Sequence, residues 1–207
     1  MNIKNIIFDL GGVILNIDFK RTYVAFQKLG MMRFEVLYSQ NKQSGLFDDF
    51  ETGKISADVF RNELRTQLQV DISDENFDEA WNAMLLDLPK DRLDFISHLR
   101  KSYRVFLFSN TNEIHLQAFF RICQRQHRIN SLMDYFEKEY YSCRFGKRKP
   151  NPEAFQIIIN ENNMNASETL FIDDTLQHVL GARQVGLCAV HLAQGKTIFD
   201  LRLMRVL

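Results

Sequence analysis

Four short apolar runs alternate with helix-like segments in this chain, one at its start and three in its second half. Continuous apolar runs predict strands that are buried on both faces of a sheet. Each of the first three runs is followed by polar residues, whereas the fourth has no acidic end. The four runs are Ile3–Phe8, Arg104–Phe108, Thr169–Ile172 and Leu187–Leu192, with a weaker candidate at Lys138–Ser142.

Helical patterns fill the gaps between these runs. Leu93, Ile96 and Leu99 recur at three-residue spacing before the second run, and Pro152 suits the first position of a later helix. Another helix is predicted within residues 175–186. Strands that alternate with helices are typical of an α/β fold with a parallel sheet covered on both faces. In such sheets ligands bind beyond the carboxyl ends of the strands.

The segment of residues 16–89 differs, because it contains no strand-like run and several amphipathic helices. Ser56 is a candidate N-cap for the middle helix. We interpret the segment as an all-helical insertion whose aromatic residues form a core of their own, which divides the chain into a core domain of residues 1–15 and 90–207 and an inserted domain of residues 16–89. Its apolar sets, each on one helical face, are Phe19, Tyr23 and Phe26; Phe60, Leu64 and Leu68; and Phe77, Trp81 and Leu85.

The composition is that of an ordinary soluble protein. The 26 Lys and Arg residues balance 26 Asp and Glu residues, so no net field favours nucleic acid or an anionic membrane. No stretch approaches the roughly 18 apolar residues of a membrane span. The 3 cysteines form no C-x-x-C pair, which fits a reducing compartment. We therefore expect a cytoplasmic monomer or small homo-oligomer, with neither nucleic acid nor membrane as a partner.

Asp9 directly follows the first apolar run, and Gly11 and Gly12 come soon after it. A carboxylate at a buried strand end needs a cation or hydrogen bonds. Two glycines allow a tight turn in which backbone amides can approach an anion. Alone, this pattern fits a strand end that caps a turn equally well. The glycines do not complete the G-x-G-x-x-G fingerprint of dinucleotide binding.

Polar residues also follow the second and third runs. Asp173 and Asp174 are adjacent acids, which repel each other unless a cation neutralises them. Mg²⁺ prefers carboxylates, water and phosphate oxygens as ligands. Ser109 and Asn110 could hold phosphate oxygens, and Lys149 adds a positive charge. The order Asp, Ser, Lys, Asp-Asp therefore indicates a site for magnesium and phosphate.

These stretches resemble the four motifs of the haloacid dehalogenase (HAD) superfamily, and the helical insertion resembles the cap of one of its subclasses. Within the superfamily the chain most resembles small sugar-phosphate phosphatases, including α-D-glucose-1-phosphate phosphatases. The subgroup resemblance rests on Ser109–Asn112 with His115 and on Glu51–Ser56 in the insertion. The four motif stretches are Phe8–Val13, Phe108–Asn112, Gly146–Pro152 with Lys149, and Phe171–Asp174 with Gly181 and Ala182.

The resemblance implies a Rossmann-like core and a Mg²⁺-dependent hydrolase that acts on a small phosphorylated metabolite, such as a sugar phosphate. Asp9 would attack phosphorus and form an aspartyl phosphate, and Lys149 would stabilise the charge of the transition state. Asp9, the carbonyl of Gly11, Asp173 and Asp174 would form the metal site, with Asp174 favoured as the direct ligand. The implied substrate-binding residues are Gly11, Gly12, Ser109, Asn110, His115 and Lys149.

The chain departs from the family pattern at Gly11, where phosphatases of this family usually carry a second Asp. That Asp protonates the leaving group, and such general acid–base help is worth about 10²–10⁴-fold in rate. Its loss predicts slow turnover, or substrates that need little protonation, such as anomeric phosphates. His178, where many relatives carry an acid, is interpreted as a helix-surface residue, and Lys147 and Arg148 as solvated loop charges.

Three alternatives remain to be weighed. A haloacid dehalogenase needs no metal, which the Asp173-Asp174 pair argues against. A catalytically weakened binding or regulatory protein is supported only by Gly11. A phosphate-accepting receiver domain expects its acidic pair at the first strand, so it fails on motif order. The patch of residues 47–50 could meet a sugar hydroxyl or simply pack the insertion.

Overall fold

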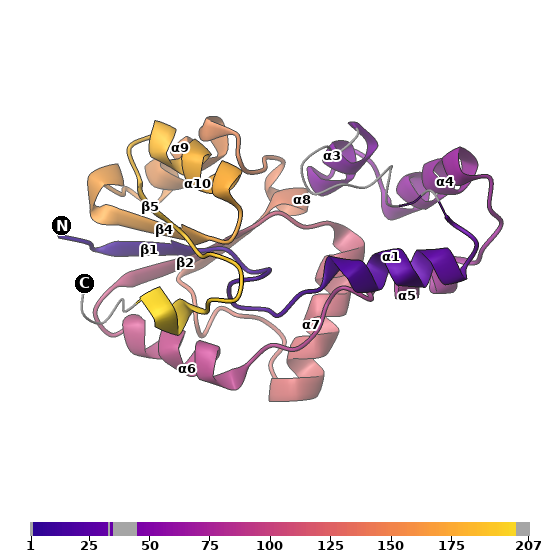
Figure 1. Ribbon diagram of the computed structural model, residues 1–207. Helices are drawn as coiled ribbons and strands as arrows, with labels where there is room; N and C mark the ends of the chain where they lie inside the picture. Colours follow the sequence, from indigo (N-terminus) through magenta and orange to yellow (C-terminus); the bar gives the residue numbers. More distant parts are fainter. Residues whose placement is uncertain (1, 33, 35–44, 202–207) are drawn as a thin grey trace.

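A five-stranded parallel sheet lies in the part of the computed structural model that holds both termini, with the helices of the insertion extending to one side (Figure 1); the structure describes residues 2–32, 34 and 45–201. Every pair of neighbouring strands is parallel, in the order β3-β2-β1-β4-β5. This sheet confirms the predicted α/β fold, the weaker strand candidate included. The strands are β1 (Asn5–Phe8), β2 (Arg104–Ser109), β3 (Lys138–Tyr141), β4 (Thr169–Asp173) and β5 (Cys188–His191).

The strand order places the end of β1 at the centre of the sheet edge. Phe8 is in register with Leu107 of β2 on one side and with Ile172 of β4 on the other. The chain proceeds from β1 to β2 and β3, and then returns to β4 across β1. Asp9, whose N–H donates to the Ile172 carbonyl at 2.9 Å, therefore lies at the point where the strand order reverses. Parallel sheets bind ligands at such a point.

Helices cover both faces of the sheet, as its apolar strands require. Alternate strand residues point to opposite faces, so Ile6 and Phe8 pack in one apolar cluster and Ile7 in another. One cluster includes side chains of α6 (Lys90–Leu99) and α7 (Glu113–His127), the other those of α9 (Pro152–Glu161) and α10 (Leu176–Gln184). Three short elements complete this part: α8 (Ser142–Phe145), η1 (Ala166–Glu168) and η2 (Ile198–Leu201).

The helix predictions outside the insertion are confirmed for α6, α9 and α10. Pro152 is the first residue of α9, and the Asn151 side chain caps it by accepting from the Glu153 N–H. The long helix α7 was missed, although Asn112 offered a signal. Its side chain accepts from the His115 N–H at 3.0 Å, and Glu113 adds an acid to the first turn.

The segment of residues 16–89 contributes the helices α1 (Phe19–Lys28), α3 (Gly45–Glu51), α4 (Ala57–Leu68) and α5 (Asp74–Asn82). Ser56 caps α4, as expected, by accepting from the Val59 N–H. The aromatic residues form a core of their own, joined by Ile114 of α7; within it Phe50 stacks on Phe60 with ring centroids 4.2 Å apart. Residues 33 and 35–44 lie outside the described part, and the proposed domain boundaries stay a prediction.

One detail of the insertion was predicted wrongly. Leu85 was placed on the same helix as Phe77 and Trp81, but α5 ends at Asn82. Leu85 lies beyond the helix and forms an antiparallel bridge with Ile17. This bridge joins the two segments that connect the insertion to the sheet. Leu85 therefore belongs to this connection and not to the apolar face of α5.

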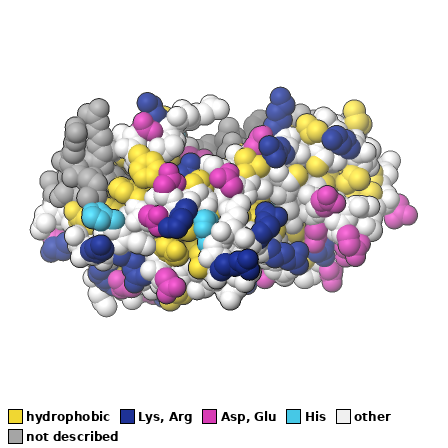
Figure 2. All heavy atoms as spheres, turned by 90° about the horizontal axis from the view of Figure 1, so that it is seen from below, with side chains coloured by type: hydrophobic (Ala, Val, Ile, Leu, Met, Phe, Trp, Pro, Cys, Tyr) yellow, Lys and Arg dark blue, Asp and Glu magenta, His cyan; other side chains and the backbone are white. Residues whose placement is uncertain are grey.

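Two observations, on helix length and on surface charge, concern the predicted absence of membrane and nucleic-acid partners. In the part of the chain that the structure describes, no helix is long and apolar enough to cross a membrane. Positive and negative side chains are interspersed over the face shown in Figure 2. The absence of nucleic-acid and membrane partners, the oligomeric state and the cytoplasmic location stay predictions.

The packing of α10 against the loop that carries Lys149 yields a first prediction. A Cβ on Gly181 would overlap the carbonyl oxygen of Pro150, a backbone atom that cannot move freely. We expect Gly181→Ala to lower the free energy of unfolding by about 1–3 kcal/mol in urea denaturation. Gly45→Ala is the matched control, because no atom of the described residues lies within 4 Å of a Cβ there and its φ is not positive. Equal stability of the two variants would contradict this packing.

Candidate active site

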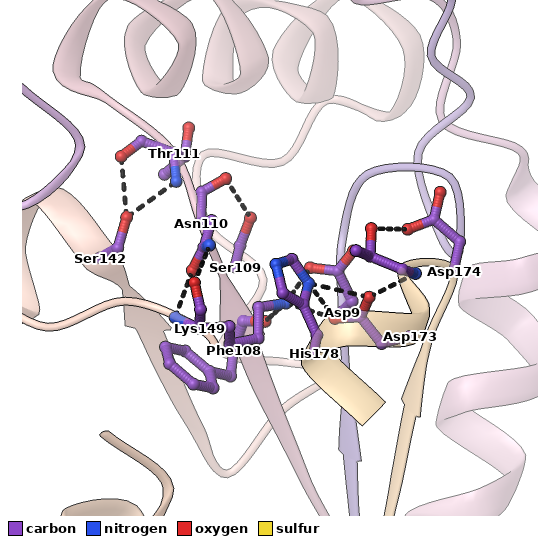
Figure 3. Close-up of polar contacts among 11 residues, drawn as sticks. Asp9, Phe108, Ser109, Asn110, Thr111, Ser142, Lys149, Asp173, Asp174 and His178 are labelled. Carbon is purple, nitrogen blue, oxygen red and sulfur yellow. Dashed lines mark hydrogen bonds and ion pairs between the residues drawn. The ribbon is translucent and has the colours of Figure 1, made fainter. Parts of the chain in front are cut away.

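The ammonium group of Lys149 is fully buried and joins the ends of three strands (Figure 3). Its Nζ atom donates to Asp9 Oδ1 at 2.6 Å, to Asp173 Oδ2 at 2.7 Å and to the Phe108 carbonyl at 2.9 Å. A buried ammonium is costly unless its donors are paired, and here three donors meet three acceptors. The polar residues that follow these strands thus lie close together, as their positions along the chain predicted.

Asn110 fixes the loop that carries Lys149. Its side-chain amide donates to the Lys149 carbonyl and accepts from the Lys149 N–H, both at 2.9 Å. The Ser142 hydroxyl bonds the N–H and the carbonyl of Thr111 at the same distance. The amide of Asn110 is therefore engaged with the backbone, although the residue still lines the cavity described below. Its contact with phosphate stays a prediction.

Three carboxylates share the site with a single buried lysine. Asp9, Asp173 and Asp174 each offer an oxygen, and these atoms lie within 4.8 Å of one another. Burial raises the pKa of Asp9 to about 7 and that of Asp174 to about 6, and the charge of Asp173 adds to both shifts. Burial also acts on Asp173, but Lys149 and His178 outweigh it and lower its pKa to about 2.

This donor set fits a divalent cation. One ammonium group cannot neutralise three carboxylates, and hard carboxylate oxygens are the ligands that Mg²⁺ prefers. Gly12, at φ +73°, belongs to the same arrangement, because a Cβ there would overlap Asp174 Oδ2. Asp173 is engaged by Lys149, by His178 and by the Thr175 N–H at 2.8 Å. Asp174 has fewer partners, which agrees with its predicted role as the direct ligand but does not test it.

His115 is buried and lines the same cavity. Its Nδ1 atom lies 2.9 Å from Asn82 Oδ1, and its ring stacks in parallel on Trp81 with centroids 4.9 Å apart. Burial lowers the pKa of His115 to about 3, so the imidazole is neutral near neutral pH. His115 can therefore offer substrate a hydrogen bond but not a charge; its contact with substrate stays a prediction.

Two basic residues were interpreted wrongly from sequence. His178 is not a plain surface residue, since its Nδ1 atom lies 3.0 Å from Asp173 Oδ1 and it lines the cavity. Arg148 is not a solvated loop charge, because it pairs with Asp48 and Glu51 of the insertion. Both errors concern the direction of a side chain, which sequence spacing does not give. Lys147 forms an exposed ion pair, as expected of a surface charge.

One cavity lies at this edge of the sheet, between the strand ends and the helical insertion. The strand ends contribute Asp9, Ser109 and Asp174, and the turn after β1 contributes Gly11. Sequence reasoning missed the remaining wall, because the insertion, α7 and the loop that carries Arg148 come together there only through tertiary packing. Side chains of that wall are Leu15, Ile17, Phe19, Glu51, Met84, Leu85, Leu116, Phe119 and Arg148.

Comparison with known proteins places this site in a family. Residues 3–186 match the family model of haloacid dehalogenase-like hydrolases. A D-ribitol-5-phosphate phosphatase of Bacteroides thetaiotaomicron is 36% identical over 184 residues, which are 89% of this chain and 89% of that protein. A sesquiterpene phosphatase of Aspergillus oryzae is 27% identical and covers 96% of this chain and 95% of its own.

Solved structures agree with this placement. A wild-type HAD family enzyme from Bacteroides thetaiotaomicron, crystallised with magnesium and inorganic phosphate, superposes with a TM-score of 0.85 at 34% identity. The match covers 97% of this chain and 99% of that one. The chain belongs to the haloacid dehalogenase-like hydrolase family, as its motifs indicated, and Mg²⁺ is the cofactor that the site and the family share.

The buried imidazole of His115 yields a prediction on pH dependence. In the unfolded chain its pKa returns to about 6.5, so below that pH protons favour the unfolded state. Between pH 7.5 and pH 5 the wild type should lose about 2 kcal/mol more stability than His115→Gln, which has no imidazole to protonate. Urea denaturation at both pH values measures this difference. Parallel losses in the two proteins would show that His115 is not buried as described.

Proposed function

We propose that this protein is a Mg²⁺-dependent phosphomonoester hydrolase that uses Asp9 as its nucleophile and acts on a small phosphorylated polyol or sugar. The observation that carries the proposal is the buried Lys149, held between Asp9 and Asp173 beside a third carboxylate, Asp174. That arrangement supplies a nucleophile, a fixed positive charge and a cation site at one edge of the sheet. A haloacid dehalogenase, which needs no metal, does not require the third carboxylate.

Asp9 attacks phosphorus in this proposal, and the bond from phosphorus to the ester oxygen breaks. The product is an aspartyl phosphate, which water then cleaves to restore the carboxylate and release inorganic phosphate. Lys149 donates to Asp9, and its positive charge stabilises the negative charge that grows on the transferring group in the transition state. Ser109 lies at the end of β2, in the cavity wall, where its hydroxyl can bond a phosphoryl oxygen.

Asp9, Asp174 and the Gly11 carbonyl would hold Mg²⁺, with Asp173 behind them. When bound, the ion neutralises negative charge on the carboxylates and on the phosphoryl oxygens. Lys149 and His178 keep Asp173 oriented beside the site.

Two features narrow the substrate. The similar phosphatase from Bacteroides is named for D-ribitol 5-phosphate, an ordinary alcohol phosphate. Gly11 supplies no acid, however, so the leaving alkoxide takes its proton from elsewhere. Anomeric phosphates lose a more acidic hydroxyl and need this proton less. We therefore propose that the enzyme is slow on alcohol phosphates and faster on anomeric ones.

The helical insertion acts as a cap in this proposal. Its Glu51 and its aromatic Phe19 face the cavity opposite the strand ends. The organic part of the ester would lie between the two parts of the chain, with water largely excluded.

Steady-state phosphate release tests the proposed nucleophile. The panel contains D-ribitol 5-phosphate, glucose 1-phosphate, glucose 6-phosphate and phenyl phosphate, each with Mg²⁺ or with chelator. We expect Asp9→Asn to lower kcat by at least about 10³-fold, because the amide cannot form the acyl phosphate. Asp94→Asn, which breaks an exposed pair with Lys90, should leave kcat unchanged. A folded wild type without turnover on any phosphate would instead support the weakened, non-catalytic alternative.

Restoring an acid at position 11 tests the proposed cause of slow turnover. A Cβ on Gly11 meets only the flexible Ile17 side chain, at 3.3 Å, so Asp fits with a small adjustment. We expect Gly11→Asp to raise kcat on alcohol phosphates by about 10-fold or more, and on glucose 1-phosphate by less. Gly11→Asn matches it in size but lacks the proton. Equal rates for the two variants would show that a missing acid does not limit turnover.

A further inference from the structure

Arg148 and Glu51 form an ion pair in the wall of the active-site cavity. Arg148 Nη2 lies 3.2 Å from Glu51 Oε2, and the two side chains are 20% and 11% exposed. Both residues line the cavity that contains Asp9. Asp48 also pairs with Arg148, but it is 49% exposed and does not line the cavity. The cavity thus has a charged pair that the hydrolytic chemistry does not use.

The backbone holds this pair in place from two sides. Gly53, at φ +70°, leaves no room for a Cβ, because the Cys143 carbonyl oxygen lies there. This close approach packs the end of α3, which carries Glu51, against α8. On the other side, Arg148 precedes Lys149, whose backbone N–H and carbonyl are both hydrogen-bonded to the Asn110 side chain. The pair is therefore set by packing and does not depend on two flexible surface chains.

The charge of this wall has a definite sign. Glu51 and Arg148 neutralise each other in the cavity wall itself, and Asp48, which pairs with Arg148 from outside the cavity, leaves a surplus of one negative charge beside it. His115 adds no charge, since burial keeps it neutral near neutral pH. Among the described residues that line the cavity away from the strand ends, the others are apolar or uncharged. A negatively charged organic group would meet net repulsion here, whereas a hydroxyl would find both donors and acceptors.

We propose that Glu51 and Arg148 are the subsite for the organic part of the phosphate ester, and that they select an uncharged, polyhydroxylated group. This proposal rests on the phosphatase activity proposed above. A substrate hydroxyl donates to the Glu51 carboxylate and accepts from an Arg148 N–H. A carboxylate or a second phosphate at that end is rejected by the negative surplus, so polyol and sugar monophosphates are hydrolysed and aldonate phosphates and bisphosphates are not.

Two substrates that differ only at the distal carbon test the selection: D-ribitol 5-phosphate, and 5-phospho-D-ribonate with a carboxylate there. In the wild type we expect kcat/KM to favour the polyol by at least about 10²-fold, and Glu51→Gln to reduce this ratio by about 10-fold. Asp49→Asn removes the same charge from the same helix, but Asp49 pairs with Lys54 outside the cavity, so the ratio should stay at the wild-type value. Phenyl phosphate, which has neither hydroxyl nor carboxylate, should be used equally by the wild type and Asp49→Asn, and it reports the phosphoryl chemistry separately from the selection.

Each contrary result has a distinct meaning. If Glu51→Gln changes both five-carbon substrates equally, or if Asp49→Asn shifts the ratio as much, the pair does not select substrate. If the wild type hydrolyses phenyl phosphate but not the polyol phosphate, the subsite is wrong while the phosphatase proposal stands. If the wild type releases phosphate from no substrate, the proposed function itself fails, and the subsite fails with it.

Discussion

The pairing of the Lys149 ammonium with Asp9, Asp173 and the Phe108 carbonyl is the interaction on which the rest of the site depends. In a buried environment, removing one partner of such a set costs about 3–5 kcal/mol, because an uncompensated charge remains. The three acceptors come from the ends of β1, β2 and β4. A single side chain thereby fixes the relative positions of three strand ends.

The same pairing leaves a negative surplus that prepares the site for a cation. One ammonium group beside three carboxylates cannot neutralise all of them; burial raises the pKa values of Asp9 and Asp174, and the negative charge of Asp173 adds to both shifts. The parallel sheet makes the arrangement possible, since its strands end at one edge and β1 lies at the centre. The three carboxylates therefore lie where the strand order reverses, which is where parallel sheets bind ligands.

Adjacent residues of one loop face different parts of the cavity region. Lys149 points into the sheet edge, whereas Arg148 reaches the helical insertion. Because Asn110 clasps the Lys149 backbone, a shift of the loop would move both side chains together. The contact with the insertion and the contact with Asp9 are thus made by adjacent residues of one loop.

The sequence by itself determined the sheet, because buried parallel strands are apolar throughout and end on polar residues such as Asp9 and Asp173. It also indicated the helical insertion, through its amphipathic spacing, and Lys149 and Asp174, whose order along the chain matches a family pattern. Only the tertiary structure decided the direction of His178 and the partners of Arg148. Those contacts join elements far apart in sequence, and neither periodicity nor spacing encodes which way a loop or helix turns a charged side chain once the elements pack.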